Sequence, residues 1–327
     1  ELCDIWTKIK ETELTTNTMK KTKSQLKTLR IIICESTPIS HIRYSDILIY
    51  RNELLHGETL YLDNPRSNKK GRTVRTVDNY IALLCSLLRF AYQSGFISTK
   101  PFEGVKKLQR NRIKPDPLSK TEFNALMESE KGQSQNLWKF AVYSGLRHGE
   151  LAALAWEDVD LEKGIVNVRR NLTILDMFGP PKTNAGIRTV TLLQPALEAL
   201  KEQYKLTGHH RKSEITFYHR EYGRTEKQKL HFVFMPRVCN GKQKPYYSVS
   251  SLGARWNAAV KRAGIRRRNP YHTRHTFACW LLTAGANPAF IASQMGHETA
   301  QMVYEIYGMW IDDMNDEQVA MLNARLS

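Results

Sequence analysis

Cysteines are few in this sequence, and their spacing suggests no covalent or metal-bound framework. The five cysteines are scattered over 327 residues, and none belongs to a C-x-x-C pair. The sequence therefore indicates neither a disulfide framework nor a thiolate zinc site, and we expect reduced thiols in the core. The histidines that come nearest to a metal cluster are in "GHH" at 208–210, His219 and His231. Their spacing fits no common zinc pattern, so we predict no metal and no cofactor.

Long apolar runs are missing as well. No stretch of about 18 apolar residues is present to cross a bilayer, and no signal-peptide core opens the chain. We therefore expect a soluble, intracellular protein with no membrane partner. The chain begins at Glu1 rather than at a methionine, which is the start expected of a fragment or a processed form.

Acidic residues are outnumbered by basic ones. Lys and Arg total 49 against 32 Asp and Glu, which gives a formal net charge of +17 and an isoelectric point near 9.6. An excess of this size favours a polyanionic partner, with nucleic acid as the first candidate and an anionic membrane surface as the competitor. A chain of this length is sufficient for about two domains.

The first hundred residues carry the apolar spacing of a helix four times, which predicts a small helical bundle. The fourth repeat ends at Gly95, a residue typical of the position just after a helix. The basic stretch at 64–76 is either a solvated loop or a loop laid against phosphates. Its cations are Lys69, Lys70, Arg72 and Arg75. The proline-containing stretch at 109–119 predicts a linker, which places the domains at 1–112 and 113–327.

The second region mixes helical and strand patterns. "SKTE" at 119–122 is a capping box that opens a helix. "GIVNVRRNLTI" and "GIRTVTL" predict the two strands of a hairpin with a long tip, and "KLHFVFM" predicts a further strand. The basic loop at 261–270 contains three further candidate DNA contacts, Arg266, Arg267 and Arg268. Residues 315–327 predict a short amphipathic tail helix, which we expect to dock on a neighbouring protomer.

Five segments carry residues suited to chemistry on a phosphodiester. Arg147 in "YSGLRHGEL" follows a glycine between two helices, where a guanidinium can bind phosphate. Lys182 lies at the hairpin tip behind two prolines, and Arg274 in "NPYHTRHTFACW" stands at the start of a helix. His297 lies in a tight corner between two helices, and Tyr307 ends the second of them.

Helix signals define that corner. Asn287 and Pro288 are expected at the start of the helix before it, and Gly296 at its end. Thr299 is expected to cap the helix that follows.

Together these side chains can attack a phosphodiester with a phenol and without a metal. Arginines offset charge on the non-bridging oxygens, the histidine donates to the same phosphate or moves a proton, and the lysine protonates the leaving oxygen. The tyrosine is the covalent nucleophile.

In their order along the chain, the segments resemble those of tyrosine recombinases, specifically a phage-type or genomic-island integrase. "SGLRHGEL" resembles the first arginine box of that family, "KT" with the later "RTV" its hairpin lysine, and "TRHTFA" its second arginine box. "MGHETAQMVYEIY" resembles its histidine and nucleophile segment. The resemblance implies an α-helical, SAM-like domain that binds core DNA, followed by a mixed α+β catalytic domain. It implies catalytic roles for Arg147, Lys182, Arg274, His297 and Tyr307.

The sequence departs from the family pattern in two places. Most members carry a histidine three residues before the second arginine, whereas Tyr271 stands here and His272 is displaced by one. Tyr271 is expected either to bond the phosphate in its place or to leave that role weakened. The interval from His297 to the nucleophile is one residue longer than usual, which favours Tyr307 but leaves Tyr304 open. Glu150 matches the acidic residue of the first box and is expected to support its arginine.

The resemblance also implies partners. These are double-stranded DNA attachment sites, together with DNA-bending and excision factors. The protein is expected to form a homotetramer on synapsed DNA, and a monomer is possible when no DNA is bound. The resemblance also implies that the protein acts at the nucleoid, in the cytoplasm of a bacterial host, where it integrates and excises a prophage or genomic island. Two alternatives stay open: a strand transferase like type IB topoisomerases, and a non-catalytic DNA-binding regulator.

Overall fold

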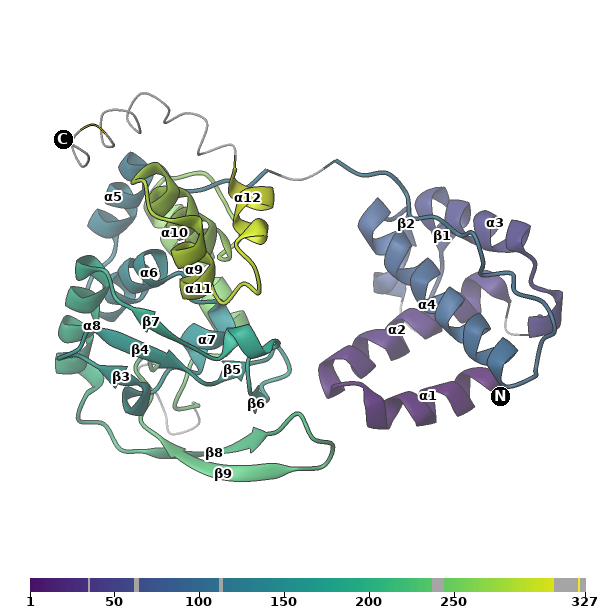
Figure 1. Cartoon of the computed structure of the whole chain (residues 1–327), viewed down its shortest axis with the longest axis horizontal. Helices are drawn as coiled ribbons and strands as arrows, with labels where there is room; N and C mark the ends of the chain where they lie inside the picture. The colour runs from purple at the N-terminus through teal and green to yellow at the C-terminus, as the bar shows by residue number, and fades with distance from the viewer. Residues whose placement is uncertain (35, 62–64, 112–113, 237–243, 309–322, 324–327) are drawn as a thin grey trace. The chain divides into compact units, whose positions relative to one another are not determined.

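The computed structural model describes residues 1–34, 36–61, 65–111, 114–236, 244–308 and 323. The chain divides into two compact units, Glu1–Ile113 and Lys114–Ser327 (Figure 1). The division falls one residue from the boundary expected from the sequence. The tail helix expected at 315–327 lies outside the described residues apart from Asn323.

In its described residues, the first unit contains four α-helices, as the apolar spacing predicted. They are α1 (Leu2–Glu13), α2 (Thr16–Ile33), α3 (Tyr44–His56) and α4 (Val74–Gln93). Helix α4 supplies more of the core than any other helix of this unit, because seven of its residues at helical spacing are buried. Gly95 follows its end with a positive φ of 76°, the conformation that favours glycine just after a helix.

The basic stretch at 64–76 is more ordered than the loop expected from its composition. Within it, β2 (Lys69–Lys70) pairs with β1 (Glu58–Thr59) in an antiparallel ribbon, and α4 begins at Val74. Both lysines are exposed. Arg72 instead lies over the ring of Tyr80, 5.5 Å from its centroid, and donates to the Thr59 hydroxyl at 2.8 Å.

The second unit is mixed α+β, as predicted. Its helices are α5 (Lys120–Ser129), α6 (Gln133–Ser144), α7 (His148–Ala152), α8 (Gln194–Thr207), α9 (Val249–Arg262), α10 (His272–Thr283), α11 (Pro288–Met295) and α12 (Gln301–Tyr307). The predicted capping box opens α5, where the Ser119 hydroxyl accepts from the Glu122 amide. Asn287 likewise caps α11. Thr299, however, does not cap α12: the residue at that position is Ala300, and no side chain bonds there.

The described part of the second unit also contains two small sheets. One has the order β3 (Val159–Asp160), β4 (Ile165–Val168), β7 (Arg188–Thr191), and the other has the order β5 (Asn171–Leu172), β6 (Phe178–Gly179), β8 (Ser213–Tyr218), β9 (Thr225–Leu230). The expected hairpin forms between β4 and β7. The strand expected at 229–235 is largely wrong, because β9 lies earlier and the apolar residues after it enter the core as irregular chain.

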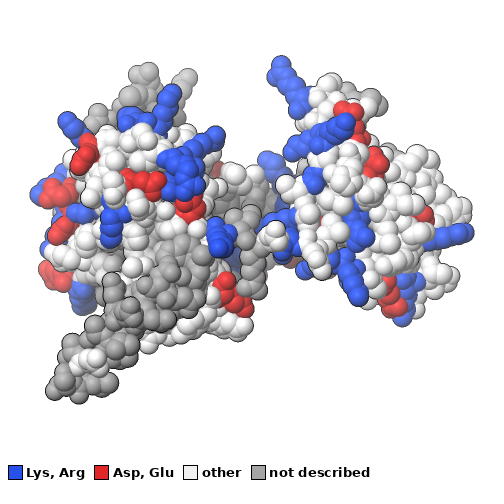
Figure 2. All heavy atoms as spheres, turned by 90° about the horizontal axis from the view of Figure 1, so that it is seen from above, with Lys and Arg blue, Asp and Glu red and all other residues white. Residues whose placement is uncertain are grey.

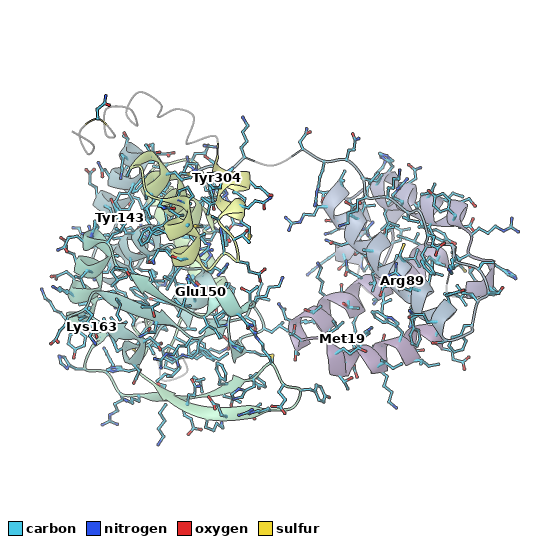
Figure 3. The ribbon with its side chains drawn as sticks, in the orientation of Figure 1. Met19, Arg89, Tyr143, Glu150, Lys163 and Tyr304 are labelled. Carbon is cyan, nitrogen blue, oxygen red and sulfur yellow. The ribbon has the colours of Figure 1, made fainter. Side chains whose placement is uncertain are left out.

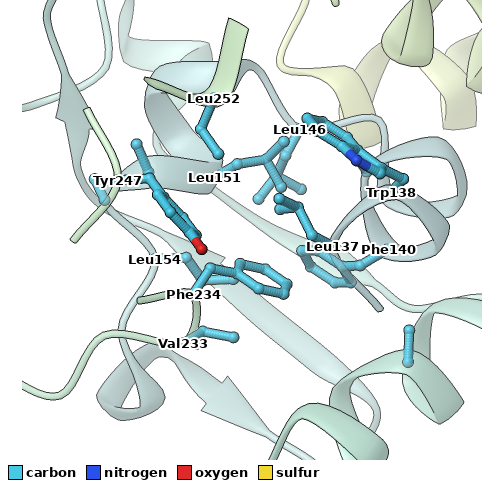
Figure 4. Close-up of a cluster of buried hydrophobic side chains, with 14 of the residues drawn as sticks. Leu137, Trp138, Phe140, Leu146, Leu151, Leu154, Val233, Phe234, Tyr247 and Leu252 are labelled. Atoms are coloured by element: carbon cyan, nitrogen blue, oxygen red, sulfur yellow. The ribbon is translucent and has the colours of Figure 1, made fainter. Parts of the chain in front are cut away.

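The core of the second unit gathers side chains from helices and from that irregular segment (Figure 4). Trp138 of α6 and Trp256 of α9 meet edge to face, with ring centroids 5.0 Å apart. Leu151 and Leu154, at and just after α7, face Phe234 and Leu252 in the same cluster. Because these large side chains are buried, α6 and α7 are held in place. Arg147, the first candidate site residue, lies between these two helices.

Basic side chains are common on the surface of both units. Lys and Arg are spread over the visible face of each unit, with fewer Asp and Glu among them (Figure 2). In the part of the chain that the structure describes, no helix is long and apolar enough to cross a bilayer.

Candidate active site

Arg147 stands at the turn between α6 and α7. Gly145 ends α6 in the left-handed conformation, with a φ of 63°. A Cβ on this residue would lie 2.5 Å from the Phe277 ring, so both the backbone conformation and the space call for glycine. The tight turn lets Arg147 begin α7, with its side chain about one-third exposed.

Glu150 is the buried carboxylate of this site, with a side chain only 1% exposed. It accepts from the Arg147 guanidinium at 2.8 Å and from the Arg147 amide at 2.9 Å. The guanidinium of Arg188 on β7 reaches it at 3.0 and 3.2 Å. Burial works to raise the pKa of Glu150, but the two arginines hold it below its ordinary value. Glu150 is therefore a carboxylate that links α7 to β7.

Three consecutive carbonyls at the end of α11 each accept from a different arginine. The Gln294 carbonyl accepts from Arg188 Nε at 2.6 Å, and the Met295 carbonyl accepts from Arg274 at 2.5 Å. The Gly296 carbonyl accepts from Arg147 at 3.4 Å.

The last carbonyls of a helix have no partner within it and carry partial negative charge. The end of α11 thus draws three cations from distant parts of the chain to one place. Around this point Arg147, Arg188 and Arg274 face one carboxylate, Glu150. The excess of positive charge favours an anion such as a phosphodiester.

Arg274 is fully buried and joins two helix ends. It donates to the carbonyl of Gly145, which ends α6, at 2.7 Å, and to Met295 at the end of α11. Burial, followed by repulsion from Arg147, lowers the pKa of Arg274 to about 10. The group is still charged near neutral pH, and its Nε atom has no hydrogen-bond partner among the described residues.

His297 directly follows the helix end that holds the arginines. Gly296 reverses the chain with a φ of 67°, and a Cβ there would lie 2.8 Å from the Ala185 carbonyl. Burial lowers the pKa of His297 to about 3, and the positive charges of Arg274, Arg147 and Arg188 act in the same direction. The imidazole is therefore neutral at pH 7. Its Nδ1 atom is shielded from solvent and has no partner within the described chain.

Tyr307 ends α12 with a side chain 1% exposed, packed among residues of α10, α11 and α12. Its hydroxyl lies 2.7 Å from Nδ1 of His275 on α10. Burial raises the pKa of Tyr307, while Arg274 and Arg147 act to lower it. Tyr304, the other tyrosine of the segment, lies on α12 and is 54% exposed (Figure 3).

Lys182 is the one predicted catalytic residue for which no contact with this group is found in the described structure. It is exposed on the loop between β6 and β7. Arg220, from the turn between β8 and β9, holds that loop by bonds to the Pro181 carbonyl at 2.8 Å and to the Asn184 side chain.

Tyr271 lies next to Arg147. It precedes α10, is 37% exposed, and interacts with the guanidinium of Arg147. The partly exposed phenol thus lies next to Arg147, at the position where the family pattern has a histidine.

The three arginines of the loop before α10 are not equivalent. Arg267 is exposed, and Arg266, also exposed, pairs with Asp116 at 2.5 Å. Arg268 is buried and paired with Glu122 at 2.8 Å and Asp116 at 3.2 Å. We assign Arg268 to holding α5 and the linker rather than to DNA contact.

Two residues of the site were missed from the sequence. Arg188 lies in "GIRTVTL" and was not predicted as a site residue. An arginine that begins a strand with apolar alternation is a signal for a buried, paired cation. His275, next to Arg274 in "TRHTFA", was not predicted as a site residue either. No sequence signal connects it to Tyr307, because their contact joins two helices.

No group of three or more His, Cys, Asp or Glu that could hold a metal is found among the described residues. The Phage integrase family model matches residues 117–309, which is more than half of the chain. The chain belongs to the phage integrase family. This integrase is therefore a tyrosine site-specific recombinase that breaks and rejoins DNA, and the topoisomerase and regulator alternatives are not supported.

A relative of high identity agrees with this assignment, and two solved structures share the fold. The prophage integrase IntR of Escherichia coli K12 is 99% identical over 327 residues, covering all of this chain and 80% of that protein. The Tn1549 transposon integrase in complex with transposon right end DNA superimposes with a TM-score of 0.70 at 20% identity, over 98% of this chain and 99% of that chain. A lambda integrase tetramer bound to a Holliday junction gives a TM-score of 0.63 at 15% identity, over 93% and 76% of the two chains.

Replacing Glu150 by Gln should leave Arg188 buried without its counter-charge. We expect a loss of about 3–5 kcal/mol in the free energy of unfolding at pH 7, measured by urea denaturation, while Glu162→Gln on the exposed turn should change little. Because folding lowers the pKa of Glu150 below its ordinary 4.5, its contribution is present above that pH and is lost as the pH falls through the folded value. Equal stability of Glu150→Gln and the parent at pH 7 would contradict this account.

Proposed function

We propose that Tyr307 is the nucleophile of this integrase and that Arg147, Arg274 and His297 bind the phosphate it attacks. The observation that carries the proposal is the gathering of two arginines and His297 at the end of α11, with Tyr307 within the electrostatic influence of both arginines. The exposed position of Tyr304 favours Tyr307 over it.

The proposed steps follow from the protonation states. The guanidinium groups offset charge on the non-bridging oxygens as phosphorus becomes five-coordinate. Neutral His297 keeps one N–H to donate to the same phosphate, and this bond would satisfy a nitrogen that is otherwise shielded and unpaired. Tyr307 forms the 3′-phosphotyrosine bond, and Lys182 protonates the departing 5′ oxygen.

Lys182 must move toward the others for this step. Its loop is held at Pro181 and Asn184 by Arg220, which leaves the lysine side chain exposed between two anchored points. DNA lying over the arginines would bring the scissile phosphate toward that side chain.

We propose double-stranded attachment sites as the substrate and a homotetramer on synapsed DNA as the working assembly. The lambda integrase tetramer on a Holliday junction supports this by likeness of fold. The first unit is assigned to core DNA, with the exposed Lys69, Lys70 and Arg75 against phosphates. We place the reaction at the nucleoid, in the cytoplasm of a bacterial host, with DNA-bending and excision factors as accessory partners.

Changing Tyr307 to Phe removes only the phenolic oxygen. We expect DNA binding in a gel-shift assay to be retained and the covalent protein–DNA adduct on a nicked half-site to disappear. Tyr304→Phe is the matched control and should form the adduct at the parental rate. Adduct formation that survives Tyr307→Phe and is lost in Tyr304→Phe would reverse the assignment.

Changing the leaving atom of the substrate distinguishes proton donation by Lys182 from an effect of its positive charge alone. Lys182→Ala should slow cleavage of an ordinary phosphodiester by about 10²–10⁴-fold, since the 5′ oxygen then departs without a proton. A substrate with sulfur at that bridging position needs no proton and should be cleaved nearly as fast as by the parent, in a single-turnover assay. Equal slowing on both substrates would show that Lys182 is not the acid.

A further inference from the structure

His275 is the polar group in contact with the oxygen of Tyr307. Its Nδ1 atom lies 2.7 Å from the phenolic oxygen, and the ring centroids are 5.6 Å apart. Tyr307 is 1% exposed, so bulk water is excluded from its side chain. A buried phenol that loses its proton must pass it to a group within hydrogen-bond reach.

The surroundings of His275 keep its ring in place. The rings of Tyr271 and His272 lie edge to face against it, with centroids at 5.1 and 5.2 Å. The His272 ring is itself anchored, since its Nδ1 atom lies 2.7 Å from the Asp116 carbonyl. His275 is thus oriented by two neighbouring aromatic rings and by α12.

The charges around His275 favour its neutral form before DNA binds. Burial, with smaller contributions from His272 and Arg274, lowers the pKa of His275 to about 4. A phosphodiester bound between Arg147 and Arg274 would offset part of that positive field. The imidazole would then become a better proton acceptor at the moment the reaction needs one.

We propose that His275 is the general base that removes the proton of Tyr307. As the phenolic oxygen bonds to phosphorus, its proton passes to Nδ1 of His275, and the bond between phosphorus and the 5′ oxygen breaks. Lys182 gives that oxygen a proton, so histidine ends as imidazolium and lysine as a neutral amine. In religation the 5′ hydroxyl returns its proton to Lys182, and His275 returns its proton to the phenol.

The proposal rests on the proposed function, because it takes Tyr307 as the nucleophile. The contact between His275 and Tyr307 has a competing interpretation, in which His275 only holds the phenol in a resting position. The two differ in what happens when the hydrogen bond is kept and the basicity is removed.

His275→Asn makes this separation. The side-chain amide oxygen of asparagine can lie near the position of Nδ1 and accept the same hydrogen bond, but it cannot take up a proton. We would measure adduct formation on a nicked half-site in single turnover, together with half-site affinity, which reports that the variant is folded. His210→Asn is the control, since it makes the same change at an exposed histidine outside the site.

If His275 is the base, His275→Asn should slow adduct formation by about 100-fold or more with unchanged DNA affinity, and His210→Asn should show little loss. Placing a fluorinated tyrosine, whose phenol is more acidic, at position 307 should then restore most of the rate. A His275→Asn variant that is as fast as the parent, or faster, would overturn the proposal in favour of a resting lock. Slow cleavage that the fluorinated tyrosine does not restore would reduce His275 to a positioning residue. Adduct formation by Tyr307→Phe would instead refute the proposed function itself.

Discussion

The site depends on how the end of α11 and one buried carboxylate hold three arginines together. Guanidinium groups at short range repel one another, and burial adds to the cost of their charge. Three successive carbonyls, of Gln294, Met295 and Gly296, each accept one of those groups, and Glu150 bonds two of them. The arrangement offsets part of the repulsion and leaves an excess of positive charge.

That excess positive charge determines how the other groups behave. Burial, together with this charge, holds His297 and His275 neutral. His297 then has a single N–H to donate, and in the proposed mechanism His275 accepts from the phenol. The same charge acts on Tyr307 in the opposite direction, favouring its anionic form against the effect of burial. A bound phosphate changes every one of these balances at once, so binding and activation are physically coupled.

The sequence predicted those features that depend on local chemistry. Capping residues located the starts of α5 and α11, glycines located the turns at Gly145 and Gly296, and motif order located the arginines, His297 and Tyr307. Local signals failed where a tertiary contact decided the outcome. Nothing near Arg188 in the sequence shows that it will pair with Glu150, 38 positions away. The contact between His275 and Tyr307 similarly arises only when α12 packs against α10.

Strand prediction failed for a related reason. The segment at 229–235 is apolar because it enters the core, not because it forms a strand, and Phe232 makes only an isolated bridge to Ala155. Strand β9 is polar and exposed along most of its length, so it lacks the apolar alternation by which strands are recognised. Its partner β8 was missed with it.

The central claim is that the arginines at the end of α11 serve a covalent attack by Tyr307 without a metal. The most direct measurement is to trap the adduct on a nicked half-site in the presence of EDTA, digest the protein, and sequence the DNA-linked peptide by mass spectrometry. The account predicts a single modified residue, Tyr307, carrying the 3′ phosphate. An adduct at Tyr304 or another residue, or none until a divalent metal is restored, would contradict it.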